Sequence, residues 1–344
     1  MRMKGRLDTM AIVEEKFLRV EKSQTEVVKV RYSIIHGDDD GPRIFVVAGV
    51  HGHELTGIEV IRRLKPYLEM MKLHGRITLL PVANPVAFST RQRGTIYDNK
   101  DLNRCFPGDK SGSFTDKLAY EIFNEIVVDN DYGIDLHTGP EGRVLLPHTR
   151  IRKCKRINQV KALSRVFGTL IAMSPDGVES MLTSCAGNRG IPTIGVELGE
   201  AYRIDEYFVN AGFFGVVNTL RYLGVLEGIA NVLDKQFILN ERHNVKAEHN
   251  GLFFPKVNLG QVVKKGDILG ELYNIESDTT ERIYAERKGI ILARFSQSVV
   301  LPDMTIMSIL TVDDCLLNNA ALKKGRYIIN HYKNPENLWS SFEY

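Results

Sequence analysis

The chain has 344 residues, of which 43% are hydrophobic and 25% are charged, and its formal net charge is +3. This composition is close to that of average globular proteins, so it excludes a chain that is mainly disordered. The near-zero net charge argues against a nucleic-acid-binding protein, and no apolar run approaches the roughly 18 residues that a membrane-spanning helix needs. The length corresponds to about two domains.

The N-terminal segment and the cysteines bear on the cellular compartment. Residues 1–30 alternate charged and apolar side chains and lack the continuous apolar core of a signal peptide. The four cysteines are widely spaced and form no C-x-x-C pair, which is typical of reduced thiols rather than of disulfides or a thiolate metal site. We therefore expect a cytoplasmic protein.

The first two thirds of the chain alternate apolar runs with segments of helical periodicity. The run at 43–50 is rich in β-branched residues, as a buried strand is, and 54–71 has apolar residues at helical spacing. The further predicted elements are a strand at 76–82, a long polar loop at 84–113, a helix at 114–128, a strand at 132–136, helices at 157–167 and 180–188, a strand at 191–198 and a helix at 205–223. This alternation predicts an α/β fold, with a mostly parallel or mixed sheet and helices on both faces.

The pattern changes near residue 228. From about 237 onward, short apolar runs are separated by glycines, which indicates a small all-β domain ending near 312. The last segment is polar and contains the only tryptophan, Trp339. We divide the chain into an α/β domain (1–228), a small β-sandwich domain (229–315) and a C-terminal tail (316–344).

Side chains that can bind a metal ion follow two of the predicted strands. His51 and Glu54 stand three residues apart at a strand-to-helix turn, and His137 ends another strand. Ligands of open α/β sheets bind beyond the carboxyl ends of the strands, and zinc accepts nitrogen and oxygen donors. These three residues could therefore share a divalent metal, with Asp135 orienting His137. The alternative for each is an ordinary polar group at a helix start or strand end.

Two other segments could complete a hydrolytic site. Glu197 lies near the end of an apolar strand, where a carboxylate can act as a general base and acid. Asn103 and Arg104 stand side by side in the long loop and together could bind a carboxylate, and Arg93 lies upstream in the same loop. The alternative for each arginine is a solvated surface charge.

The order of these motifs resembles that of a known family, the succinylglutamate desuccinylase/aspartoacylase family of zinc-carboxypeptidase-like hydrolases. The resemblance covers roughly residues 40–225 and extends to the glycine-punctuated C-terminal region. The residues that carry it are His51-x-x-Glu54, Arg93, Asp101-Leu102-Asn103-Arg104-x-Phe106-Pro107-Gly108, Asp135-Leu136-His137-Thr138 and Val196-Glu197-Leu198-Gly199.

The resemblance implies a role for each of these positions. His51, Glu54 and His137 would bind one zinc ion per chain. Glu197 would be the general base and acid, and Arg93 would polarise the scissile carbonyl group. Asn103 and Arg104 would hold a substrate carboxylate. The expected function is a zinc-dependent deacylase that hydrolyses the amide bond of an N-acyl amino acid or a similar small carboxylate-bearing amide.

Two alternative functions and several partner questions stay open. One alternative is a zinc carboxypeptidase that acts on peptide or cell-wall fragments, and the other is a catalytically idle binding protein on the same fold. We expect a small-molecule N-acyl substrate, no nucleic acid and no membrane, and we leave open a homo-oligomer. The small β domain could be a lid, a spacer or an oligomer contact. Five cations fall within seven residues at 150–156, and the near-neutral net charge favours a solvated surface for them over an anion-binding patch.

Overall fold

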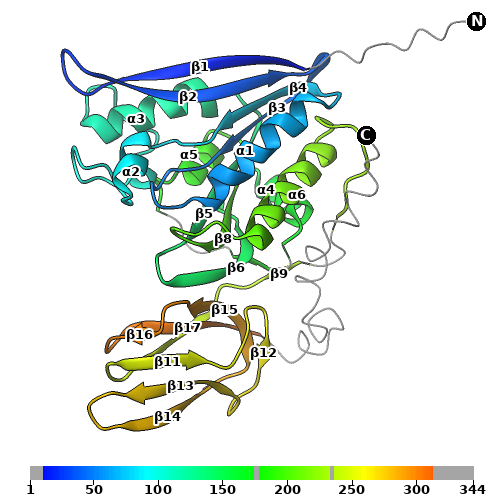
Figure 1. The fold of residues 1–344 in the computed structure, drawn as a ribbon. Coiled ribbons are helices and arrows are strands. Elements are labelled where there is room, and N and C mark those ends of the chain that lie inside the picture. The colour runs from blue at the N-terminus through cyan, green and yellow to red at the C-terminus, as the bar shows by residue number, and fades with distance from the viewer. Residues whose placement is uncertain (1–10, 170, 174–177, 233–235, 313–344) are drawn as a thin grey trace, which may run out of the picture.

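The structure is a computed structural model that describes residues 11–169, 171–173, 178–232 and 236–312. Helices surround a large twisted sheet, and a β-rich C-terminal region lies at one end of it (Figure 1). Among the described residues, no helix combines the length and apolar character needed to cross a membrane. The helices are α1 (Thr56–Glu69), α2 (Pro85–Thr90), α3 (Phe114–Ile122), α4 (Ile157–Phe167), α5 (Leu182–Asn188) and α6 (Glu206–Tyr222), with short 3-10 and π-helical turns at η1 (Leu102–Arg104) and η2 (Phe123–Val127).

The sheet has a parallel centre and antiparallel flanks. Its strands run in the order β1-β2-β4-β3-β5-β8-β6-β15-β17-β10, and the neighbours among β4, β3, β5 and β8 pair in parallel. The strands before residue 201 are β1 (Ile12–Glu21), β2 (Val27–His36), β3 (Asp39–Val47), β4 (His74–Leu80), β5 (Tyr132–Gly139), β6 (Arg143–Arg150), β7 (Ile171–Met173) and β8 (Thr193–Glu200). The predicted mixed α/β architecture is confirmed.

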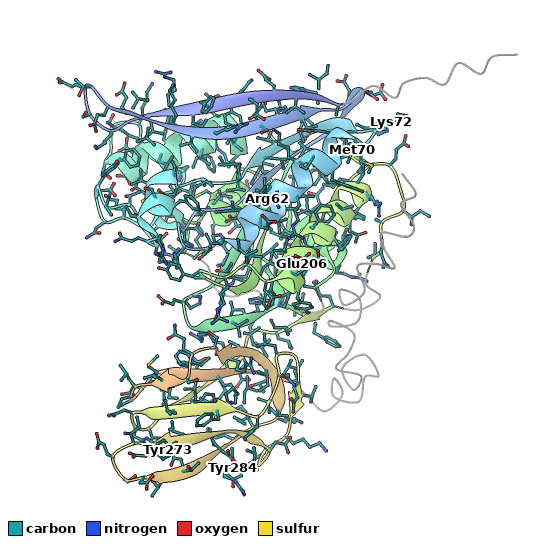
Figure 2. The ribbon with its side chains drawn as sticks, viewed as in Figure 1. Arg62, Met70, Lys72, Glu206, Tyr273 and Tyr284 are labelled. Atoms are coloured by element: carbon teal, nitrogen blue, oxygen red, sulfur yellow. The ribbon has the colours of Figure 1, made fainter. Side chains whose placement is uncertain are left out.

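Helices cover both faces of this sheet because its central strands are apolar on both sides. On β3, Ile44 and Val46 pack in one core with side chains of α1, α4 and α6, whereas Phe45 and Val47 pack in a second core with α3 and α5. Arg63 joins α1 to α6 at the surface through an ion pair with Glu206. Figure 2 shows Arg62 and Glu206 on the solvent side of these two helices.

The structure adds elements that the sequence analysis does not predict. β1 and β2 form an antiparallel hairpin at the edge of the sheet, where alternating charged and apolar residues fit a half-exposed strand. The loop expected at 84–113 contains α2 and η1. β6 was also missed, and it pairs antiparallel with β8 next to the parallel centre.

The C-terminal region is all-β, as predicted, and its strands divide between two sheets. β11, β13, β14 and β16 form a separate four-stranded sheet, with Tyr273 on the inner strand β13 and Tyr284 on the edge strand β14 (Figure 2). β15 instead pairs with β6 and so extends the main sheet. The strands are β9 (Phe237–Ile238), β10 (Arg242–Lys246), β11 (Gly251–Pro255), β12 (Val262–Val263), β13 (Ile268–Asn274), β14 (Thr279–Tyr284), β15 (Gly289–Phe295), β16 (Val299–Val300) and β17 (Thr305–Thr311). The expected tail at 316–344 lies outside the described residues, and the domain boundaries stay a prediction.

Candidate active site

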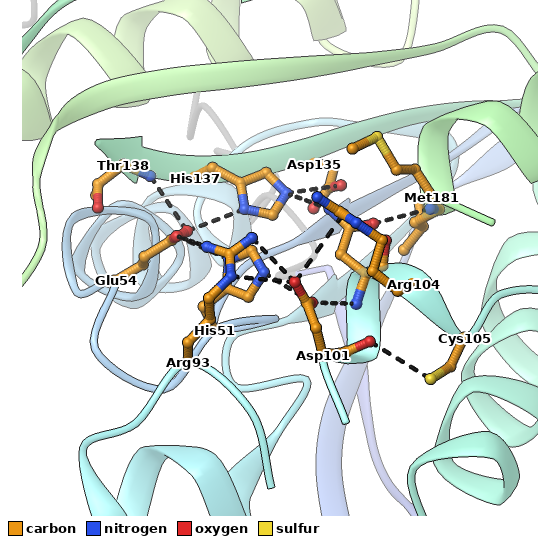
Figure 3. A network of polar contacts seen from close by, with 12 residues as sticks. His51, Glu54, Arg93, Asp101, Arg104, Cys105, Asp135, His137, Thr138 and Met181 are labelled. Atoms are coloured by element: carbon orange, nitrogen blue, oxygen red, sulfur yellow. Dashed lines mark hydrogen bonds and ion pairs between the residues drawn. The ribbon is translucent and has the colours of Figure 1, made fainter. Parts of the chain in front are cut away.

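Two neighbouring parallel strands bring the expected metal ligands together. His51 and Glu54 lie in the turn between β3 and α1, and His137 lies on β5, which pairs with β3. The turn begins at Gly49, where φ is +63° and a Cβ atom would approach the Val82 backbone to 2.9 Å. All three ligand side chains are buried, and one donor atom of each lies within 4.8 Å of the others (Figure 3).

Each histidine contacts Glu54 with one ring nitrogen and a second carboxylate with the other. The Nδ1 atoms of His51 and His137 lie 2.7 and 2.9 Å from the two oxygens of Glu54. The Nε2 atom of His51 lies 3.1 Å from Asp101 Oδ1, and that of His137 lies 2.9 Å from Asp135 Oδ2. The expected orienting role of Asp135 thus has the matching geometry, and Asp101 provides the same contact for His51, which the sequence analysis did not foresee.

Burial and charge act against each other in this cluster. Burial alone would raise the pKa of Glu54, but the two imidazoles outweigh it and hold this pKa well below its usual value. For His137, burial alone would lower the pKa, yet Asp135 and Glu54 raise it well above its usual value. The cluster therefore favours an ionised carboxylate at Glu54 and positive charge on the imidazoles that contact it.

The donor set of this cluster fits a zinc ion. Two imidazole nitrogens and one carboxylate oxygen are a common protein ligand set of catalytic zinc sites, which leave a further position open. The backbone N–H of Thr138 donates to Glu54 Oε2 over 3.2 Å and helps to fix that carboxylate. Because Glu54 contacts both imidazoles through Nδ1, these are the nitrogens that face a shared centre, while the Nε2 atoms face Asp101 and Asp135.

The loop between β4 and α3 is held in shape by hydrogen bonds to a half-buried carboxylate, that of Asp98. Asp98 accepts hydrogen bonds from the side chains of Thr95, Ser113 and Thr115, and these contacts lower its pKa although burial alone would raise it. The loop is thus ordered, and it carries Arg93, Asn103 and Arg104 to the edge of the metal-ligand cluster.

Arg93 is the loop cation nearest to the metal-ligand cluster. Its Nη1 atom lies 3.9 Å from Glu54 Oε1, and its Nε and Nη2 atoms each lie 3.0 Å from Asp101 Oδ2. Arg91, two residues earlier, instead stacks on the ring of Tyr202 at 5.5 Å. Asp101 therefore holds Arg93 and His51 together.

Asn103 and Arg104 lie beside each other but differ in exposure. Asn103 is buried, its Oδ1 atom accepts a hydrogen bond from the Leu182 N–H over 3.0 Å, and its Nδ2 atom lies 3.5 Å from His137 Nε2. Arg104 is partly exposed, and its Nη1 atom donates to the Asn103 carbonyl oxygen over 2.8 Å. The amide of Asn103 thus links the metal-ligand cluster to α5, while the guanidinium of Arg104 stays accessible to a ligand.

Glu197 faces the same cavity from β8, and Arg150 and Arg152 line the cavity with it. Glu197 is 8% exposed, and its Oε1 atom lies 2.9 Å from Arg150 Nε. Arg150 and Arg152 both line the cavity, but the Arg150 side chain is 32% exposed, so the expectation of a solvated surface at 150–156 is wrong only for the buried Arg152. Lys153, the next residue, is exposed as expected.

One cavity of about 220 Å³ contains all the residues that the sequence analysis expected at the site. The sequence analysis did not place the cavity walls, which include residues of α5 and of the segment after β5. The lining residues are His51, Glu54, Arg93, Asn103, Arg104, Asp135, His137, Thr138, Gly139, Pro140, Leu145, Arg150, Arg152, Met181, Thr183, Gly195 and Glu197.

Comparison with known proteins agrees with the motif pattern. Residues 40–223 match the succinylglutamate desuccinylase/aspartoacylase catalytic domain. The chain is 28% identical over 276 residues to the N-alpha-acetyl-L-2,4-diaminobutyric acid deacetylase of Halomonas elongata, an alignment that covers 77% of this chain and 81% of the relative. A succinylglutamate desuccinylase/aspartoacylase from Rhodobacter sphaeroides has a similar crystal structure, with a TM-score of 0.76 at 25% identity over 91% of this chain and 99% of that chain.

A second solved structure supports the fold alone. The product-bound ectoine utilization protein of Ruegeria pomeroyi matches with a TM-score of 0.76 at 21% identity and covers 90% of this chain and 98% of that chain. The family match spans more than half of the described chain and contains the whole metal-ligand cluster. The chain therefore belongs to the succinylglutamate desuccinylase/aspartoacylase family, as its motifs predict.

Proposed function

We propose that the protein is a zinc-dependent deacylase that hydrolyses the amide bond of an N-acyl amino acid. The observation that carries this proposal is the buried His51–Glu54–His137 cluster, which shares one cavity with Glu197 in a member of this family. His51, Glu54 and His137 would hold one zinc ion per chain. When bound, zinc supplies Lewis acidity and lowers the pKa of water at the site.

Glu197 would act as the general base and acid. Its carboxylate faces the cavity, and the ion pair with Arg150 restrains it there. Glu197 takes a proton from the attacking water and then returns it to the departing amine, so one carboxylate serves both halves of the hydrolysis.

The arginines of the long loop have separate roles. Arg93 lies close to Glu54 and is fixed by Asp101, so its guanidinium can stabilise negative charge on the scissile carbonyl oxygen. Arg104, with the amide of Asn103, can bind a carboxylate of the substrate. The cavity of about 220 Å³ has room for a small acylated amino acid.

The test is a metal analysis combined with a hydrolysis screen. The purified chain, loaded with zinc, is incubated with acetyl-, succinyl- and longer acyl-amino acids, and the free amine is quantified. We expect about one zinc ion per chain and amine release that metal removal abolishes and zinc restores. A chain that binds no zinc, or a loaded chain that releases no amine from any N-acyl amino acid, would contradict the proposal and favour an idle binding protein.

A further inference from the structure

Tyr202 lies just after the end of β8, on the same segment as Glu197, and it contacts two other segments of the site. Its backbone N–H donates to the carbonyl oxygen of His53 over 2.8 Å, and its hydroxyl group donates to the carbonyl oxygen of Arg91 over 2.8 Å. His53 lies in the turn that carries the metal ligands, and Arg91 lies in the long loop that carries Arg93. One residue therefore joins the three segments that hold the side chains of the proposed reaction.

The backbone is left-handed at both residues that the hydroxyl contact joins. The φ angle is +62° at Tyr202 and +56° at Arg91, in a region that residues other than glycine rarely adopt. Such a conformation costs free energy and persists where the surrounding structure fixes it. The two residues are therefore held in place by their contacts rather than by local backbone preference.

The aromatic ring of Tyr202 contacts the same two segments as its polar groups. The ring centroid lies 5.4 Å from that of the His53 ring and 5.5 Å from the guanidinium carbon of Arg91. His53 is buried, whereas Tyr202 is 36% exposed. Within the described part of the chain, the lining of the active-site cavity does not include Tyr202, so a role in the reaction would pass through a neighbouring residue.

The contact at Arg91 restrains the backbone two residues before Arg93. Gln92, which lies between them, accepts a hydrogen bond from the Gly52 N–H over 2.9 Å, and its own N–H donates to the Ala87 carbonyl oxygen over 2.9 Å. The Arg93 side chain is 49% exposed, so packing alone does not fix its guanidinium group. The position of this group therefore depends on its ion pairs and on the backbone that the contact at Arg91 restrains.

We propose that Tyr202 is a positioning residue, whose hydroxyl group holds the long loop so that Arg93 reaches the scissile carbonyl oxygen of the substrate. The inference rests on the proposed deacylase function, in which Arg93 stabilises negative charge on that oxygen. Because this charge develops in the transition state, a displaced guanidinium group lowers kcat more than it raises KM. The hydroxyl group of Tyr202 thus acts on the reaction through Arg93.

The test removes this hydroxyl group alone. Tyr202→Phe retains the ring and the backbone bond to His53 but loses the hydrogen bond to Arg91. A neutral hydrogen bond contributes about 2- to 10-fold to an equilibrium. We therefore expect kcat for an N-acyl amino acid that the wild type hydrolyses to fall by about this factor, while KM and zinc content stay unchanged. A rise in KM with unchanged kcat would overturn the proposal, because the hydroxyl group would then act on substrate binding.

A control variant and a double variant assign the loss to Arg93. Tyr222→Phe, the same change on a tyrosine that is 46% exposed at the end of α6, should alter neither kcat nor KM. Arg93→Gln removes the guanidinium group that Tyr202 positions, so Tyr202→Phe should lower kcat much less in this background than in the wild type. An equal loss in both backgrounds would overturn the proposal, since the hydroxyl group would then act through another residue.

Amide hydrogen exchange separates this inference from the deacylase proposal, because it requires no turnover. In the purified protein with zinc added, the amides of Gly52 and Gln92 should exchange faster in Tyr202→Phe than in the wild type or in Tyr222→Phe. That result in a protein that releases no amine would support the restraint of the loop by Tyr202 while contradicting the deacylase function. Unchanged exchange in Tyr202→Phe would overturn the role of Tyr202, whether or not amine is released.

Discussion

The two carboxylates that contact the Nε2 atoms of the ligand histidines, those of Asp101 and Asp135, should increase the affinity for zinc. Substitution of Asp135 tests this most directly. Its Oδ2 atom lies 2.9 Å from His137 Nε2, and the residue is 1% exposed, so no solvent can replace the lost partner after substitution. Removing such an outer partner typically weakens metal binding 10- to 100-fold, or about 1.4–2.8 kcal/mol. Because Asp135 is fully buried, we expect Asp135→Asn to fall in the upper half of this range.

Asp101→Asn should differ from Asp135→Asn in a way that the geometry specifies. The Asp101 side chain is 20% exposed, and it contacts His51 over 3.1 Å and Arg93 over 3.0 Å. The loss of zinc affinity should be smaller, since water can reach the exposed edge of the imidazole contact. The loss of activity, however, should persist at saturating zinc because Arg93 is no longer held near Glu54.

The assay has two readouts and one control. Competition with a fluorescent chelator gives the zinc Kd of each metal-free variant, and kcat/KM is then measured at saturating zinc. We expect zinc to restore most of the activity of Asp135→Asn and little of that of Asp101→Asn. Asp40→Asn, the same change on an exposed residue, serves as the control. An Asp135→Asn variant with wild-type zinc affinity would refute the reasoning.

Three further predictions concern single residues. Glu197→Gln removes the proton acceptor, so kcat should fall roughly 10²- to 10⁴-fold, while zinc content measured by mass spectrometry stays at the wild-type level. Gly52→Ala would place a Cβ atom 2.0 Å from the Ala87 backbone, so the chain beside the ligand turn must shift, and zinc content and melting temperature should both fall. Burial lowers the pKa of His148 from 6.5 to about 3, so the unfolded chain takes up the proton first as the pH falls below 6.5, and the fold loses about 2 kcal/mol by pH 5. Denaturant unfolding of the metal-free proteins should show that, between pH 7.5 and 5, the free energy of unfolding of the wild type falls by about 2 kcal/mol more than that of His148→Leu; equal changes in both would contradict the prediction.

The sequence predicted the site best where metal-binding side chains follow the ends of predicted strands. His51, Glu54 and His137 were grouped correctly because parallel strands end at one edge of the sheet, so the spacing along each strand places the side chains. The contact of Asp101 with His51 joins residues fifty positions apart through a folded loop. No local pattern encodes such a contact, although Asp101 belongs to the motif that carries the family resemblance.

The hairpin of β1 and β2 shows a different limit. Its residues alternate charged and apolar side chains, which is the pattern of a strand with one solvent-facing side. We interpreted that alternation only as evidence against a signal peptide, although the same observation carried the strand period. The alternation alone does not show which strand pairs with which. An edge hairpin can therefore be predicted only once the sheet that it extends is known.

The cavity wall at Arg150 and Arg152 depends on a strand that the sequence conceals. β6 contains Pro147, a residue that argues against an inner strand unless it lies at a bulge. Between Leu145 and His148, β6 advances three residues while β8 advances two, so one extra residue stands there. Strict alternation would place Leu145 and Arg150 on opposite faces of the sheet, yet both line the cavity. The bulge at Pro147 thus turns the end of β6 inward and makes a cationic cavity wall out of a sequence that resembles a solvated surface.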